Sequence, residues 1–445
     1  MTAQAVPTVS TSASSTYRRY VVWLLFAIAV MNYFDRQIVN ILAEHIKRDL
    51  DLADWQLGAL TGLAFASLYI LLGVPVALLA DRSSRSRIIT ISLAFWSIFT
   101  AVCGLAQNFT SLLLARLAVG VGEAGCQPPS HALISAYTAP AERSKAMGVY
   151  ALGVPVGSLL ALAAGGILAE QVGWRTAFFI AGAPGLALAL LAAFTLRDPA
   201  KSAAASAGRA ARSVRATLVE LRGNAAFWWL SLGAAAMAFV SYGQLAFFGS
   251  FFLRVHRAGL ADLAAQASDV SGATLGPTAI VGIGLGLIVG IAGILGAWLG
   301  GVLGDRLARR SPTALMWIPA IAAPMCLPFY VMAFLTPSTP AALFFLFLPK
   351  LIGGVWLAPT FAALQSVVAP DTRATASALH SSVVLLFGLG LGPIGIGALS
   401  DALSHAGLGE ADGVRWALIG ASCMCALAAV FFTIAARRMA GAKLS

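Results

Sequence analysis

The sequence predicts an all-α membrane protein with twelve transmembrane helices arranged as two pseudo-symmetric six-helix bundles. Composition is the first observation behind this prediction, because 59% of the 445 residues are hydrophobic and only 11% are charged. A soluble domain carries about 25% charged residues, so most of this chain is expected to face hydrocarbon or a protein interior within it. The spacing of the apolar runs and an internal repeat are the other two observations.

The apolar runs are long enough to cross a bilayer, which takes about 20 residues. Turn-forming residues at Gln107-Asn108 and in the segment 337–340 divide two stretches that would otherwise be too long. The predicted helices span residues 20–43, 56–80, 87–107, 110–133, 144–169, 174–196, 225–253, 279–302, 313–335, 341–366, 373–400 and 414–436.

A basic, Ala- and Ser-rich stretch at 197–223 separates the two halves, and we predict it to be a cytoplasmic linker. The N-terminal bundle is then 18–196 and the C-terminal bundle 224–437. Residues 1–17, rich in Ser, Thr and Ala, are predicted to form a disordered cytoplasmic tail, and residues 438–445 a second tail. The first apolar run is a full span without a small-residue cleavage site, so we expect it to be retained.

An internal repeat relates the halves. An Asp-Arg pair follows the second helix (77–82) and again the eighth (301–306), 224 residues later. A Pro-x-x-Arg sequence opens the fifth helix (140–143) and again the eleventh (370–373), 230 residues later. Parallel halves related about the membrane normal are a transporter pattern that places the substrate site between them at mid-membrane.

The net charge of +11 does not indicate nucleic-acid binding, because the basic residues fall between the apolar runs. With the N-terminus inside, 20 of the 29 Lys and Arg lie in inside segments, 6 in outside segments and 3 within helices. This asymmetry follows the positive-inside rule and predicts that both termini are cytoplasmic. Since no eukaryotic targeting signal is visible, we expect a bacterial inner membrane.

Four segments carry a resemblance to a known family. The loop 77–87 resembles the cytoplasmic signature of the major facilitator superfamily, with Ser84 where that signature usually has Gly. The segment 116–122 (Arg-Leu-Ala-Val-Gly-Val-Gly) resembles its fourth-helix motif, and 153–157 and 390–393 its Gly/Pro-rich helix motif. The resemblance covers essentially the whole chain and implies the major facilitator fold, secondary transport and a monomer.

A narrower resemblance lies in the first and fourth helices. The pair of segments 32–36 (Asn-Tyr-Phe-Asp-Arg) and 122–125 (Gly-Glu-Ala-Gly) is similar to the Spinster branch of that superfamily, whose members export lysolipids or sphingoid lipids. The resemblance implies an amphiphilic, lipid-like substrate, which composition alone does not indicate.

Charges within membrane spans are costly and mark functional candidates; here they are Asp35, Arg36, Arg116, Glu123 and Lys350. By helix rise, Asp35 lies about 12 Å from the outer end of the first helix and Arg116 about 9 Å deep in the fourth, so they can meet. Glu123 follows Arg116 by seven residues and shares its face. We predict that Asp35, Arg36, Arg116 and Glu123 form a proton-coupling and substrate site. Rocking of the two bundles would change the Glu123–Arg116 distance, and Arg36 would hold an anionic head group. The alternative is a fixed ion pair between helices.

Two further groups receive predicted roles. Asp81 and Arg82, with Arg85, lie at the cytoplasmic membrane edge, where an acid can interact with the N-terminus of the helix that begins near Arg373. They are predicted to gate the cytoplasmic side, and Asp305 and Arg306 to do the same in the other half. Aromatic residues are predicted to line a pocket for an acyl chain, with lipid-facing rings as the alternative: Tyr33, Phe65, Tyr69, Phe239, Tyr242 and Phe247.

Several chemistries are not predicted. The five cysteines lack metal-site spacing, so we expect no metal. No Walker motif or enzyme signature is present, so we expect no cofactor and no catalysis. The glycines at 282, 286 and 290 could suggest a nucleotide-binding loop, but no strand precedes them. They predict close helix packing instead. His131 and His380 lie in apolar helices and are interpreted as packing residues.

We therefore predict a secondary transporter that moves a lysolipid or sphingoid-type lipid by alternating access, coupled to protons. Three alternatives remain open. A proton-driven efflux antiporter for cationic drugs would use Asp35 and Glu123 as counter-charges. A lipid receptor on the same fold would bind without flux. An uncoupled facilitator would be insensitive to a pH gradient.

Overall fold

The computed structural model describes residues 14–64, 66–68, 71–72, 83–139, 142–198, 214–308, 311, 313–369 and 372–441. Within these ranges the regular structure is entirely helical, as predicted. Phe65, Tyr69, Asp81 and Arg82 lie outside the described residues.

The helices of the first half follow the predicted spans. The fourth and fifth spans are each divided by a short break, near Gly125 and Leu152, and Pro residues in the first turn of α6 suit a restart there. In order, the elements are α1 (Ser15–Leu50), α2 (Asp54–Gly58), η1 (Ala59–Leu63), α4 (Arg85–Cys103), α5 (Phe109–Ala124), α6 (Gln127–Tyr137), α7 (Arg143–Ala151), α8 (Gly153–Gln171) and α9 (Gly173–Thr195).

The second half repeats this pattern, with π-helical turns inside its second and fifth spans and a third one between its last two spans. Its elements are α10 (Val214–Gly223), α11 (Ala225–Val255), α12 (Arg257–Ser271), α13 (Pro277–Leu287), η3 (Ile288–Ala292), α14 (Gly293–Ala308), α15 (Ala314–Leu335), α16 (Thr339–Gly354), α17 (Leu357–Val367), α18 (Arg373–Leu385), η4 (Leu386–Leu391), α19 (Gly392–Leu403), η5 (Ser404–Leu408), α20 (Gly409–Ser422) and α21 (Met424–Gly441).

These helices form the predicted twelve-span fold. Ten stretches of the described residues are long and apolar enough to cross a membrane. The last of them, Thr375–Ala440, contains two crossings, because Gly407 takes a left-handed conformation (φ +100°) and reverses the chain between α19 and α20. The second predicted span lies partly outside the described residues, and with it the total is twelve.

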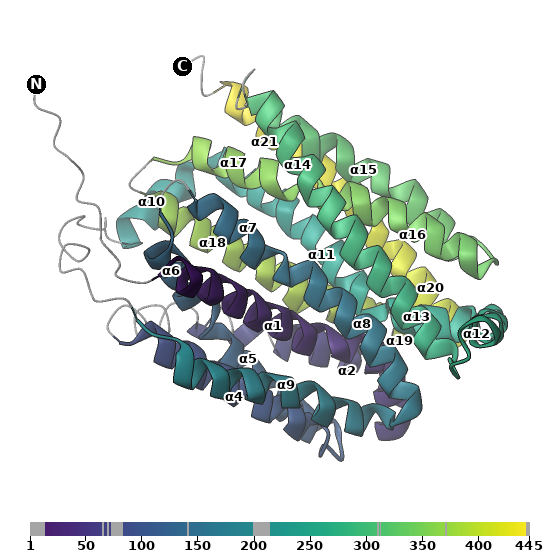
Figure 1. The fold of residues 1–445 in the computed structure, drawn as a ribbon. Helices are drawn as coiled ribbons and strands as arrows, with labels where there is room; N and C mark the ends of the chain where they lie inside the picture. Colours follow the sequence, from purple (N-terminus) through teal and green to yellow (C-terminus); the bar gives the residue numbers. More distant parts are fainter. Residues whose placement is uncertain are drawn as a thin grey trace, which may run out of the picture.

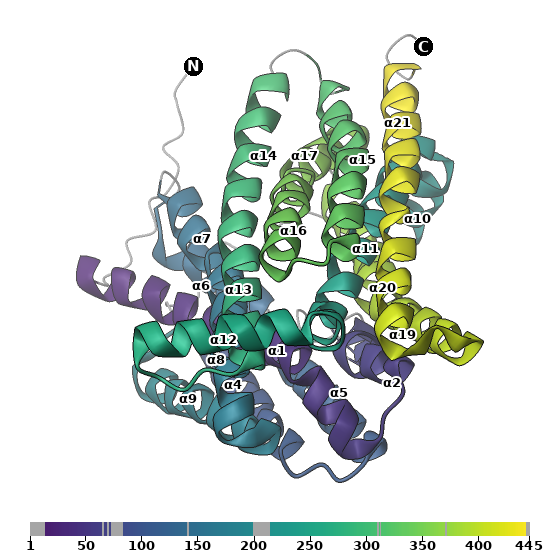
Figure 2. The same cartoon turned by 90° about the vertical axis from the view of Figure 1, so that its right-hand side faces the viewer.

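The two halves lie side by side, and the start of α1 and the end of α21 are at one end of the molecule (Figure 1). We call this end the termini end and the opposite end the far end. At the far end α12 lies across the ends of the spans (Figure 2). Exposed apolar side chains such as Phe194 and Trp298, with 81% and 63% of their surfaces accessible, cover the outside, as expected of helices that face lipid.

Glycines bring the halves together along two seams. In the first, α8 meets α13: a Cβ on Gly166 would lie 2.6 Å from the Thr278 carbonyl oxygen, and one on Gly282 would overlap the Leu162 carbonyl. In the second, α2 meets α19, where Gly397 packs on the backbone of Asp54. Such small-residue contacts let helix backbones approach closely, which confirms the packing role predicted for the glycines of the eighth span.

Candidate functional site

Four ionisable side chains are buried together in the N-terminal half. Asp35 and Arg36 come from α1, and Arg116 and Glu123 from α5; each is at most 9% exposed. Glycine packing places them: Gly157 of α8 lies against the backbone of α1, and a Cβ on Gly122 of α5 would lie 2.7 Å from Trp96 of α4. We call these four residues the core cluster.

Glu123 is paired with Arg36. The Arg36 Nη2 donates to Glu123 Oε2 at 2.8 Å and its Nε to the same oxygen at 3.2 Å. Arg36 also donates to Asn32 Oδ1 at 3.3 Å, and its guanidinium carbon lies 4.8 Å from the centre of the Tyr33 ring. The sequence predicts Arg116 as the cation nearest Glu123 and places Arg36 at the substrate cavity. In the structure the cation paired with Glu123 is Arg36, because it reaches across from α1 to α5.

Asp35 and Arg116 are neighbours, as their depths suggested, but they meet through the backbone. Arg116 Nη1 donates to the Asp35 carbonyl oxygen at 3.2 Å, and Asp35 Oδ2 accepts from Trp96 Nε1 at 3.1 Å. Asp35 Oδ1, Arg116 Nε and Arg116 Nη2 are buried without a hydrogen-bond partner among the described residues. A buried polar group without a hydrogen bond costs about 1–3 kcal/mol.

A cavity of about 290 Å³ opens beside Glu123 between α1, the α5–α6 stretch and α7–α8. Glu123 Oε1 is buried and has no hydrogen-bond partner among the described residues. Among the residues that the structure describes, it is also the one carboxylate on the cavity wall. The polar part of this wall consists of Asn32, Tyr33, Glu123, Gln127, His131 and Tyr150.

The predicted aromatic positions differ in their surroundings. Tyr33 lines the cavity of the N-terminal half. Phe239 and Tyr242 are half-buried on α11, where Phe239 lies beside Gly395 and Tyr242 packs on Ala66 and Leu389. Phe247 is fully buried in the hydrophobic core.

Lys350 occupies the corresponding position in the C-terminal half. Its Nζ donates to the Ser241 carbonyl oxygen on α11 at 3.3 Å and lies 5.1 Å from the centre of the Phe248 ring. Arg116 and Lys350 thus each sit on the fourth helix of a half and bond to the backbone of its first helix. In the N-terminal half, the carboxylates Asp35 and Glu123 lie next to this cation. The core cluster, as defined above, therefore belongs to the N-terminal half.

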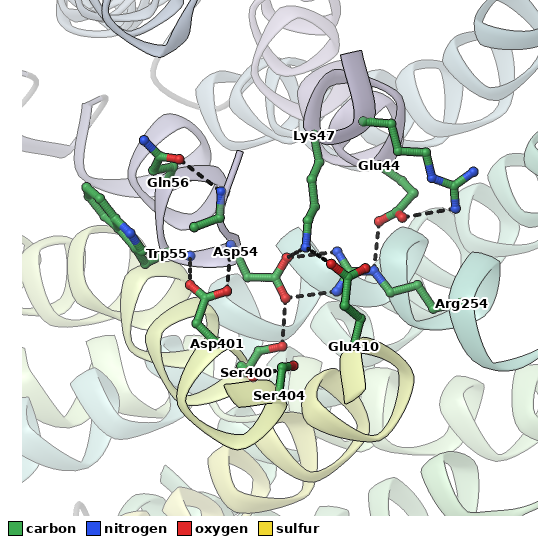
Figure 3. A network of polar contacts seen from close by, with 12 residues as sticks. Glu44, Lys47, Asp54, Trp55, Gln56, Arg254, Ser400, Asp401, Ser404 and Glu410 are labelled. Atoms are coloured by element: carbon green, nitrogen blue, oxygen red, sulfur yellow. Dashed lines mark hydrogen bonds and ion pairs between the residues drawn. The ribbon is translucent and has the colours of Figure 1, made fainter. Parts of the chain in front are cut away.

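A second charged network, at the far end, joins the two halves and was not identified from the sequence (Figure 3). Arg254 at the end of α11 holds Asp54 with two bonds of 2.8 Å and donates to Glu44 of α1 at 2.9 Å. Lys47 of α1 donates to Asp54 at 2.9 Å and to Glu410 of α20 at 3.1 Å. We call this network the far-end lock; its members are Glu44, Lys47, Asp54, Arg254, Ser400, Asp401 and Glu410.

Two further contacts between the halves are carboxylates bound at helix N-termini. Asp401 of α19 accepts from the backbone N–H of Asp54 at 2.9 Å and of Trp55 at 2.8 Å, where α2 begins. Glu170 of α8 accepts from the N–H of Gly276 and Thr278, at 2.8 and 2.6 Å, where α13 begins. A negative charge is stabilised at a helix N-terminus, so each inter-half seam carries one such contact.

Asp54, which precedes the predicted second span, is held in its charged form. Burial alone would raise the pKa of this carboxyl, but hydrogen bonds and charge from Arg254 and Lys47 outweigh burial and hold the pKa well below its usual range. The signal for the far-end lock was present in the sequence as acids beside bases at helix ends. It was missed because Lys47 and Arg254 had been assigned to outside segments.

The predicted gating residues that the structure describes lie at the termini end. Arg85 begins α4 and is half-buried, and Asp305 and Arg306 are exposed near the end of α14. The start of α4 is capped by Asp198 of the same half, which accepts from the Ser86 N–H at 3.1 Å. Asp81 and Arg82, the centre of the predicted gate, lie outside the described residues.

Comparison with known proteins agrees with this architecture. The Major Facilitator Superfamily profile matches residues 25–386. An MFS-type efflux pump of Mycolicibacterium smegmatis is 33% identical over 86% of this chain and 84% of its own length. Protein spinster homolog 3 of Danio rerio is 30% identical over 89% of this chain and 80% of its own.

A solved structure is similar over nearly the whole chain. It is a bacterial homologue of the human lysosomal transporter Spinster in an inward-facing, occupied conformation, with a TM-score of 0.82, 31% identity, and coverage of 96% of this chain and 98% of that one. The nucleoside transporter NupG, at 16% identity and a TM-score of 0.71, shares the fold. The chain is therefore an integral membrane transporter rather than an enzyme, and it belongs to the Spinster-like branch of the major facilitator superfamily.

Proposed function

We propose that this transporter moves a lysolipid or sphingoid-type lipid by alternating access, coupled to protons. The observation that carries the proposal is the buried Arg36–Glu123 pair, with one carboxylate oxygen unpartnered beside a cavity. Such a pair can exchange a proton for a counter-ion inside the membrane. The moving bodies are the predicted bundles 18–196 and 224–437, with 197–223 as the linker between them.

The coupling step is a competition for Arg36. When Glu123 is ionised, it occupies Arg36 and no free guanidinium is presented. Protonation of Glu123 removes the negative charge, and Arg36 can then bind a phosphate or carboxylate with two parallel hydrogen bonds. Proton and anionic head group therefore bind together. Asp35, beside Arg116, is the second acid of this site.

The closed far-end lock supports an inward-facing state. If both termini are cytoplasmic, as the distribution of Lys and Arg predicts, the far end is the outside face and the central site opens inward. We infer a bacterial inner membrane as the location and a monomer as the working unit. Reporter fusions that are active on only one side of the membrane, placed at each terminus, test this orientation.

The decisive test is flux of labelled lysolipid in proteoliposomes with and without a pH gradient. Glu123→Gln is expected to remove the stimulation by the gradient, because a side-chain amide does not ionise in this pH range, while the protein still folds. Glu142→Gln, an exposed position, is the matched control and should behave as the natural protein. Full gradient-driven transport by Glu123→Gln would exclude the proposed coupling.

One observation favours a second candidate, an efflux antiporter for cationic compounds. Within the described part of the chain, Glu123 is the one formally charged side chain on the cavity wall, and a relative is an efflux pump. A cation would bind Glu123 directly and displace the proton. Competition experiments separate the candidates, since a cationic dye inhibits lysolipid flux only if it occupies the same site. A receptor would show binding without flux, and an uncoupled facilitator would show flux unaffected by pH.

A further inference from the structure

The cavity beside Glu123 extends along the fourth span toward the termini end. Glu123, Gln127 and His131 follow one another at intervals of four residues, and all three line the cavity. Residues four apart lie on one face of a helix, and this face continues across the break between α5 and α6. The wall therefore leads from a fully buried carboxylate to a half-buried imidazole.

His131 is only partly engaged in packing. Its ring makes an edge contact with Tyr150 of α7, with 5.1 Å between the ring centroids. The other titratable groups on the wall are Glu123 and Cys126 from the α5–α6 stretch, Tyr33 from α1 and Tyr150 from α7. α4, which also packs on α6, adds no residue to the wall, and Arg36 approaches only through Glu123. Imidazole is the one group among these that exchanges protons readily near neutral pH.

We propose that His131 is the proton-transfer residue that connects Glu123 with the water at the termini end. This inference rests on the proposed coupling at Glu123. The two residues are about 12 Å apart along the helix axis at about 1.5 Å per residue, too far for direct transfer. One water molecule needs about 10–15 Å³ of cavity volume. The cavity of about 290 Å³ therefore has room for a chain of several waters.

The step conserves charge and atoms. The Glu123 carboxylic acid gives its proton to the water chain, the chain passes one proton to the free imidazole nitrogen of His131, and imidazolium releases it to bulk water. Glu123 is left ionised and takes Arg36 again. Uptake runs the same steps in reverse.

The test is the rate of proton movement in proteoliposomes loaded with pyranine, after lysolipid is added under a pH gradient. His131→Gln should slow this rate by about a hundredfold, the lower end of what a positioned proton-transfer group contributes. Lysolipid exchange without a gradient should be unchanged, and added imidazole should restore the rate. His131→Phe keeps the ring contact with Tyr150 and should be slow in the same way. His380→Gln, a buried histidine of the other half, should match the natural protein.

The outcomes separate this inference from the proposed function. Natural rates in both His131 variants, with coupling lost in Glu123→Gln, would overturn the relay and leave the coupling site in place. His131 would instead be a packing residue if proton movement is slow in His131→Gln, is not restored by imidazole, and is fast in His131→Phe. That result would also overturn the relay. Full coupling in Glu123→Gln would overturn both.

Discussion

The far-end lock and the core cluster are both buried networks of acids and bases, but they differ in how fully their polar atoms are hydrogen-bonded. In the far-end lock the Asp54 carboxylate has partners on both oxygens, and the network spans both halves. In the core cluster Asp35, Arg116 and Glu123 each have a polar atom with no hydrogen-bond partner in the described ranges, and all members belong to one half. A satisfied network holds a conformation, whereas an unsatisfied one can gain a proton or a ligand.

The largest expected effect comes from breaking the far-end lock at its centre. Arg254→Met leaves Glu44 and Asp54 buried without their shared cation, which costs about 3–5 kcal/mol. We expect a lower melting temperature and a wider far end, measured as the distance between spin labels on α1 and α20. Arg257→Met, at an exposed position three residues later, should change neither. An unchanged distance in Arg254→Met would show that the lock does not hold the halves.

Breaking the core cluster should affect transport without opening the far end. Arg36→Met leaves Glu123 buried without a counter-ion, at a cost that again reaches about 3–5 kcal/mol when the carboxylate is ionised. Stability should therefore fall as pH rises, and lysolipid flux should be lost at every pH. Thermal melting across pH 5 to 8 measures the first effect. A melting curve independent of pH would contradict the assigned pairing.

The glycine seam between α2 and α19 predicts a smaller effect. Gly397→Ala places a methyl group in overlap with the Asp54 carbonyl, and such overpacking costs about 1–3 kcal/mol. The expected result is a lower melting temperature and a shift toward the state open at the far end. Gly301→Ala is the control, since nothing lies within 4 Å of its added Cβ, and alanine there favours the helix. Equal melting temperatures would show that the seam tolerates a methyl group.

The smallest expected effect is that of pH on the far-end lock itself. The pKa of Asp54 is held below its ordinary value of 3.8, so its contribution is complete above that value and is lost only as pH falls through the lowered pKa. Between pH 5 and 8 the far-end spin-label distance should stay constant in the absence of substrate. A change within that range would assign pH sensing to the lock instead of the core cluster.

The sequence was sufficient for the fold, because span length and glycine spacing are local properties of the chain, and the repeat is visible when its two halves are compared. It also identified the members of the core cluster, since charges within apolar helices are rare. The pairing was beyond it: the spacing of Arg116 and Glu123 shows a shared face, but not that Arg36 reaches across from α1. The lock was missed because its charged residues lie at helix ends outside the predicted spans, and because contacts such as Lys47 with Glu410 join residues 363 apart.

Proton-coupled transport by this site requires Glu123 to take up a proton when substrate binds. Calorimetry of lysolipid binding, in two buffers with different protonation enthalpies, counts that proton directly. We predict net uptake of one proton per bound lysolipid by the natural protein and none by Glu123→Gln. Equal uptake by both proteins would place the coupling proton elsewhere and contradict the account.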